Sequence, residues 1–183
     1  MSLPRAPDRL SDEMAQAIGH TVSTFGFLEE ALKRAIFSLT RQGLGQNADD
    51  EALQKWLRRM EDIADDSLGT LIDSFLAAMK QAHLDERHVL ADILTGIRVQ
   101  RNLLCHASWR PGKGPGRWYP TFINTRGESH PDDMAAEDVL AVQATTLKAA
   151  RRVVSIMRAT GIDGEWLGWE DDDKDNDNQH GGA

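Results

Sequence analysis

The chain has 183 residues, 40% of them hydrophobic, and a formal net charge of −8 at pH 7, a length and composition that predict one domain with its own core. No apolar run approaches the roughly 20 residues that cross a bilayer, and the first residues lack the apolar stretch of a signal peptide, so we expect a cytoplasmic protein whose residues 1–9 are flexible. The lone cysteine, Cys105, excludes an internal disulfide and argues against structural zinc, and we expect neither a metal nor another cofactor.

Apolar residues that recur at steps of three and four predict a series of amphipathic helices. The first helix runs from about 11 to 41 and ends near Gly43 and Gly45. Apolar positions at 53–63 and at 68–79 follow, with Ser67 as a possible cap between them, and they form either one kinked helix or two. A helix from about 85 to 107 comes next, and a last helix covers apolar positions 140–157 and ends at Gly161. The sequence therefore predicts an all-α bundle of four to five helices.

Glycine and proline interrupt the sequence between the last two helices, from Pro111 to Pro131. Aromatic and β-branched side chains at 117–123 favour an extended segment or a short hairpin, and we interpret the region as a flexible basic flap. The run 112–116 superficially suggests a phosphate loop, but it lacks the spacing and the Lys-Ser/Thr ending of a Walker motif.

Much of the negative charge lies in residues 163–183, an acidic tail with too few apolar side chains to order itself, which we expect to be disordered. Six acidic residues and one lysine between 170 and 177 give a net charge of −5 there.

By contrast, no acidic residue lies between Gly96 and Gly127, a stretch that we call the basic island. Its cations are Arg98, Arg101, Arg110, Lys113, Arg117 and Arg126. Such a local patch governs contact with phosphates more than the net charge does, although a solvated loop with scattered arginines gives the same pattern.

The most informative residues of the fourth helix lie near its end. On a helix, Arg98, Asn102 and His106 follow one another at steps of four and line one polar face. Arg101 lies roughly 140° from His106, within the apolar stripe of the helix. Because a guanidinium in that position needs a partner, we predict an ion pair with Glu29, which lies on the apolar stripe of the first helix. The alternative is that Glu29 merely reaches solvent at the edge of its stripe.

The run from Arg101 to His106 resembles the Arg-x4-His signature of HEPN domains, including Asn102 directly after the arginine. With the helices before and after the motif, the resemblance spans about residues 10–162. The resemblance implies a small helical nucleic-acid-binding fold that often acts as a ribonuclease. It implies a two-fold homodimer in which both copies of the motif face one cleft, with Arg101, Asn102 and His106 as catalytic residues. It also implies a toxin or antiviral defence effector, with an antitoxin or an effector-complex protein as a possible partner. Family toxins controlled by nucleotidyl modification carry a tyrosine where this chain has Ser108, which speaks against that control.

These residue types suit the cleavage of RNA without a metal. One group must take the 2′-hydroxyl proton or protonate the departing 5′-oxygen, and a fixed positive charge must stabilise the phosphorane. An imidazole titrates near neutral pH, and a guanidinium stays charged and forks onto two phosphate oxygens. His106 would then serve as acid or base and Arg101 as the charge, while Asn102 orients the ring or the substrate. The ordinary alternative for His106 is a helix-terminal histidine that interacts with the last carbonyls.

Further candidate RNA contacts follow the motif at Arg110, Lys113, Arg117 and Trp118. Trp118 either stacks on a base or packs the flap onto the bundle. Three functions remain open at this point. The chain is a metal-independent endoribonuclease of HEPN type that cleaves single-stranded RNA, a non-catalytic RNA-binding module, or a helical subunit that binds a protein partner through its apolar faces and acidic tail.

Overall fold

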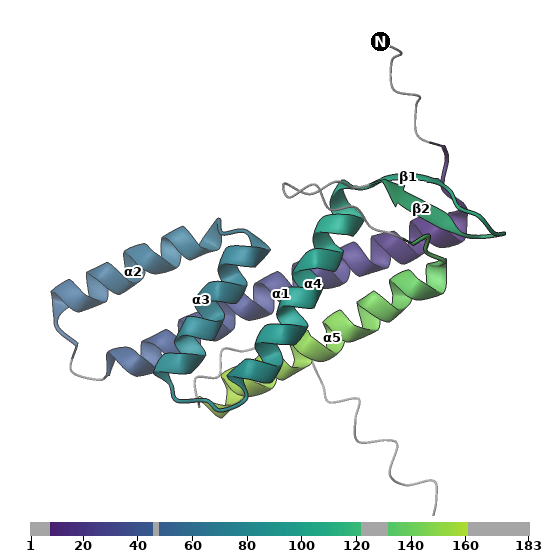
Figure 1. The fold of residues 1–183 in the computed structure, drawn as a ribbon. Coiled ribbons are helices and arrows are strands. Elements are labelled where there is room, and N and C mark those ends of the chain that lie inside the picture. Colours follow the sequence, from purple (N-terminus) through teal and green to yellow (C-terminus); the bar gives the residue numbers. More distant parts are fainter. Residues whose placement is uncertain (1–7, 46–47, 122–131, 161–183) are drawn as a thin grey trace, which may run out of the picture.

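The computed structural model describes residues 8–45, 48–121 and 132–160. This part of the chain holds five α-helices and one two-stranded antiparallel sheet (Figure 1). The prediction of an all-α bundle with a short hairpin after the fourth helix is therefore confirmed. Residues 1–7 of the predicted flexible N-terminus and the whole predicted acidic tail, 163–183, lie outside the described residues.

Helix α1 (Asp12–Leu44) is the longest element, and its ends follow from local chemistry. The hydroxyl of Ser11 accepts a hydrogen bond from the backbone N–H of Met14, at 3.3 Å, which caps the first turn. At the other end Gly45 has a φ of 76°, a left-handed conformation that glycine adopts without strain. Between these ends the face that carries Leu28 and Leu32 is fully buried and forms the centre of the core.

The next two apolar stretches form two separate helices, α2 (Asp50–Ala64) and α3 (Leu68–Gln81). The side chain of Ser67 accepts a hydrogen bond from the N–H of Thr70 at 3.3 Å, so the predicted cap is confirmed and starts a new helix. Helix α3 buries its apolar face in the core, whereas α2 contacts the C-terminal part of α1. There the indole N–H of Trp56 donates to the hydroxyl of Thr40, at 3.0 Å.

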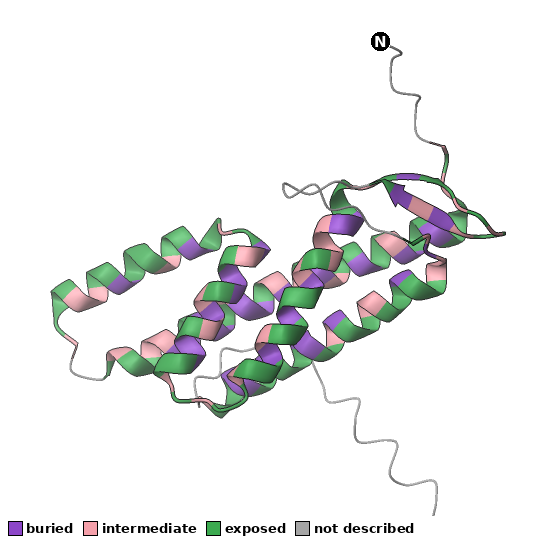
Figure 2. Cartoon of the chain, viewed as in Figure 1, coloured by how far each residue is buried: buried purple, intermediate pink, exposed green. Residues whose placement is uncertain are grey.

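Helices α1 and α5 (Ala136–Ala159) begin at the same end of the molecule and run side by side, and α4 (Arg87–His106) packs on both (Figure 1). Buried residues recur along each of these helices, as Figure 2 shows, and they belong to one core. One polar contact ties α1 to α5. The buried hydroxyl of Thr21 donates to the carbonyl oxygens of Ala17 and Val139, at 2.7 and 3.3 Å.

Strands β1 (Ser108–Pro111) and β2 (Trp118–Thr121) follow α4 directly and form a hairpin in which Pro111 pairs with Trp118. Trp118 also exchanges two backbone hydrogen bonds with Met134, just before α5, at 2.7 and 2.8 Å. A Cβ atom at Gly112 would lie 2.9 Å from the backbone oxygen of Arg117 and 2.7 Å from a carboxylate oxygen of Asp133, so only glycine permits this approach. Residues 108–121 are therefore anchored to the bundle and do not form a free flap, while 122–131 lie outside the described residues.

Candidate nucleic-acid interface

The last two turns of α4 carry the Arg-x4-His residues. Leu103 and Leu104 are buried and hold this end of the helix on the core. Arg101 and Asn102 are half-buried, and His106, the last residue of the helix, is exposed. The arginine therefore lies at the edge of the apolar stripe, and its guanidinium keeps access to solvent.

Arg101 faces α1, as predicted from the two apolar stripes. Its Nη2 lies 3.7 Å from Oε1 of Glu29, which makes an ion pair, although the distance exceeds that of a hydrogen bond. The Arg101 Nη1 atom also lies 3.5 Å from Oδ1 of Asn102, at the limit of a weak hydrogen bond. Glu29, Arg101 and Asn102 thus form one polar cluster at the crossing of α1 and α4. In this cluster the Asn102 oxygen is directed to Arg101 and not to the imidazole.

His106 lies on a different surface. It lines an open groove of about 620 Å³ together with residues 8–10, the first turns of α1 and Ala107–Trp109. Leu10 and Trp109 supply apolar surface in this groove, Arg9 supplies one cation, and Asp8 and Asp12 supply carboxylates. The groove includes neither Arg101 nor Asn102. The angular separation of Arg101 and His106 that the helix geometry predicts is therefore present within the single chain.

Arg98 has its own environment, on α3. A Cβ atom at Gly69 would lie 3.3 Å from Cδ of Arg98 and 3.8 Å from its Nη1, so the arginine lies over the first turn of α3. The absence of a side chain at Gly69 leaves the space that Arg98 occupies. Arg98 is also not part of the His106 groove. The polar face that the sequence assigns to Arg98, Asn102 and His106 is thus divided among three different surroundings.

Among the predicted RNA contacts on the hairpin, Arg117 makes intramolecular contacts. Its Nε donates to Oδ1 of Asp133 at 2.6 Å, its Nη2 donates to the Asp133 carbonyl at 2.6 Å, and Asp138 lies 3.5 Å away. The hydrogen bond to Asp133 raises the pKa of the Arg117 guanidinium. The same bond, with a second one from the Lys113 backbone N–H, lowers the pKa of the Asp133 carboxyl. Arg117 therefore fixes the hairpin to the start of α5.

The remaining hairpin candidates divide into exposed cations and a buried ring. Arg110 and Lys113 are exposed. Trp118 is only 9% exposed and belongs to the core, where it packs the hairpin onto the bundle. In the described residues this burial supports packing over base stacking for Trp118.

Two cations of the basic island, Arg101 and Arg117, have carboxylate partners that lie outside this acid-free stretch. Glu29 from α1 pairs with Arg101, and Asp133 and Asp138 pair with Arg117. Sequence reasoning missed both aspartates because they lie beyond the acid-free interval. A signal for one of them exists, since the Asp138 side chain accepts from the backbone N–H of Ala135 at 2.8 Å, as acidic residues in a first helical turn often do.

Within the described ranges, no group of three or more His, Cys, Asp or Glu side chains is placed to hold a metal ion. None of the helices in this part of the chain is long and apolar enough to span a membrane. Comparisons of the chain with protein-family models, with curated proteins and with solved structures found no match. The fold and the side chains described above are therefore the basis for a functional proposal.

Proposed function

We propose that the chain is a metal-independent endoribonuclease of HEPN type that cleaves single-stranded RNA as a homodimer. The observation that carries the proposal is the arginine paired with Glu29 at the α1–α4 crossing, together with the exposed histidine at the end of the same helix. Glu29 holds Arg101 at 3.7 Å while leaving its side chain 30% exposed, so the guanidinium can still reach a phosphate. His106 is exposed and lines a groove.

A dimer is part of the proposal because the two groups lie on different surfaces of one chain. Arg101 faces the cluster at α1, and His106 faces the groove beside residues 8–10. A second protomer could bring its own His106 or Arg101 to a phosphate that the first protomer holds. A two-fold arrangement with the α4 ends of both protomers at one cleft would do so.

The reaction that suits these groups is an internal transesterification of RNA. The 2′-oxygen attacks the phosphorus, its proton passes to a base, and the bond to the 5′-oxygen breaks as that oxygen takes a proton. The His106 imidazoles of the two protomers would supply the base and the acid, and Arg101 would stabilise the charge of the phosphorane. The products are a 2′,3′-cyclic phosphate and a 5′-hydroxyl. DNA is not cleaved, because it lacks the nucleophile.

The test is an incubation of wild type, His106→Ala and Arg101→Ala with single-stranded RNA in EDTA, with a DNA of the same sequence as control. We expect wild type alone to cleave RNA, with a loss of roughly 10²-fold or more in each variant. Circular dichroism of each variant checks that it is folded. Equal cleavage by all three preparations would show a contaminating nuclease and would refute the assignment of the two residues.

A non-catalytic RNA-binding module is the second candidate, and the separation of Arg101 from His106 in one chain favours it. Sedimentation of the chain distinguishes the two candidates. A strict monomer that binds RNA without cleaving it would support the module, whereas the endoribonuclease requires the dimer. A toxin or defence role rests on the resemblance alone. Growth arrest of cells that express wild type but not His106→Ala would support that role.

A further inference from the structure

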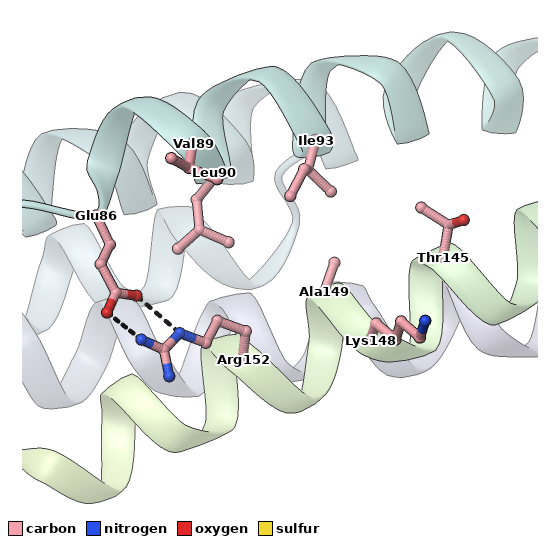
Figure 3. Close-up of a pocket in the computed structure, with 8 residues that line it drawn as sticks. All are labelled: Glu86, Val89, Leu90, Ile93, Thr145, Lys148, Ala149 and Arg152. Atoms are coloured by element: carbon pink, nitrogen blue, oxygen red, sulfur yellow. Dashed lines mark hydrogen bonds and ion pairs between the residues drawn. The ribbon is translucent and has the colours of Figure 1, made fainter.

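The face between α4 and α5 carries an apolar groove that shares no lining residue with the His106 groove. It consists of two adjoining pockets of about 440 and 410 Å³ that share Ile93 and Thr145. Figure 3 shows Leu90 and Ile93 of α4 pointing toward α5, which contributes Ala149, and Val89 also lines the first pocket. Val89 is 66% exposed and Ile93 is 38% exposed. Neighbouring aliphatic side chains exposed along one groove are typical of a surface that binds an apolar partner.

The polar residues of this groove define what it can accept. Glu86 and Arg152 form an ion pair at one end (Figure 3), in which Arg152 Nε lies 2.7 Å from Oε2 of Glu86. Lys148 lines the first pocket, and it has no carboxylate partner among residues 8–45, 48–121 and 132–160. Gln100 lines the second pocket, and its buried Oε1 accepts no hydrogen bond from the described residues. The first pocket therefore suits an apolar segment that carries an acidic group beside Lys148, whereas Asp92, which lines the second pocket, disfavours an acidic group there.

We propose that the segment from Ile162 to Trp169 of the same chain binds in this α4–α5 groove. The proposal does not depend on the ribonuclease activity. Within eight residues the segment contains four large apolar side chains, at Ile162, Trp166, Leu167 and Trp169. These are too few to form a core of their own, but they can bury their surface against an existing groove.

The chain length permits this return. Helix α5 ends at Ala159, and Ala149 lies ten residues earlier, which is about 15 Å along the helix. Residues 160–165 span at most about 20 Å when extended, so Trp166 can reach the level of Ala149. Trp169 lies about 10 Å further along an extended segment, which matches the roughly 10 Å from Ala149 to Val142 in the second pocket. Trp169 thereby reaches the pocket that contains Gln100.

Charge and tethering favour the same occupant. Glu165 directly precedes Trp166 in the sequence, so the proposed occupant carries a carboxylate that Lys148 of the first pocket can attract. Because the segment belongs to the same chain, its effective concentration at the groove is of the order of millimolar. A modest apolar contact is then sufficient to keep it bound. The bound segment would cover α4 and α5 and would withhold the groove from other apolar partners.

The test uses the full chain with the photo-crosslinker p-benzoylphenylalanine in place of Trp169. Irradiation followed by mass spectrometry should give crosslinks within one chain to the groove residues of α4 and α5. Val89→Glu combined with Ile93→Glu should lower the yield roughly tenfold, because a carboxylate resists burial in an apolar groove. Val99→Glu is the matched control, since Val99 is 58% exposed on the same helix but lines neither pocket, and it should leave the yield unchanged.

Circular dichroism verifies that the groove variants keep the helical fold. Crosslinks between two chains at the groove would overturn the proposal and would assign the groove to a second copy. Crosslinks only to other surfaces, or equal yields in the groove variants and the control, would also overturn it. Loss of RNA cleavage plays no part in this readout, so the proposal and the proposed ribonuclease function fail independently.

Discussion

Glu29 of α1 and Arg101 of α4 face each other where the two helices cross, with 3.7 Å between Oε1 and Nη2. Both side chains are partly exposed, by 28% and 30%, so solvent screens the pair, and it contributes about 1 kcal/mol or less to stability. We expect its main effect to be on the orientation of the guanidinium, which faces Glu29 on α1. Removing the carboxylate charge should therefore affect a reaction that uses Arg101 more than it affects the fold.

Glu29→Gln is expected to lower RNA cleavage by roughly tenfold to a hundredfold, because a displaced guanidinium stabilises the phosphorane less well. Glu30→Gln is the matched control, since Glu30 pairs with Arg34 at 2.7 Å on the exposed side of the same helix. Single-turnover cleavage rates and urea unfolding of both variants are the measurements. Equal rates for the two variants would show that Glu29 does not position Arg101.

Trp118→Ala should destabilise the protein by about 3 kcal/mol or more, because the ring is 9% exposed and packs the hairpin on the bundle. Urea unfolding followed by circular dichroism measures this loss. Trp118→Phe keeps an aromatic ring in the core, and it should bind RNA as wild type does. If Trp118→Phe instead weakened RNA binding without changing the unfolding midpoint, base stacking would be the correct role for Trp118.

The helices were predictable because burial of one face leaves a periodic trace in the sequence. The same trace placed Glu29 and Arg101 on stripes that face each other, and the structure contains that contact. The partners of Arg117 left no such trace, since Asp133 and Asp138 reach it through an irregular connection and not through a repeating face. A stretch without acidic residues shows only that no carboxylate is close in sequence. An ion pair forms between charges that are close in space, and these can be far apart in the sequence.

The polar face of α4 shows the same limit. Helix geometry places Arg98, Asn102 and His106 in one row, but it does not say which neighbouring element each side chain meets. Arg98 extends over α3 because position 69 is a glycine, and His106 meets residues 8–10, which belong to no helix. Such surroundings depend on the packing of several elements, so a periodic pattern in one helix cannot predict them.

Arg117→Met should lower the urea midpoint at neutral pH, because it removes the contacts that fix the hairpin to the start of α5. Arg110→Met, on the neighbouring strand and exposed, is the control and should change the midpoint little. The difference should depend on pH. The Asp133 pKa is lowered in the folded protein, so its stabilising contribution is full above the unfolded pKa of about 3.9.

As the pH falls below that value and through the folded pKa, Asp133 becomes protonated and the contribution is lost. The midpoints of wild type and Arg117→Met should then converge in acid. A difference that stayed constant from neutral to acidic pH would mean that the arginine acts through packing and not through its charge.

Thr21→Val tests the one buried hydroxyl that links α1 to α5 in the described residues. The Thr21 hydroxyl is fully buried and lies 2.7 Å from the Ala17 carbonyl and 3.3 Å from the Val139 carbonyl. Valine has nearly the same shape, so the change removes the hydrogen bonds and preserves the packing. We expect a loss of about 1 kcal/mol in the free energy of unfolding, measured by urea titration.

Thr24→Val is the matched control, because the Thr24 hydroxyl donates a hydrogen bond to the His20 carbonyl within the same helix. It should change stability by less than about 0.5 kcal/mol. Equal losses in the two variants would mean that the bond within α1, which both threonines make, accounts for the effect and that the contact with Val139 contributes nothing.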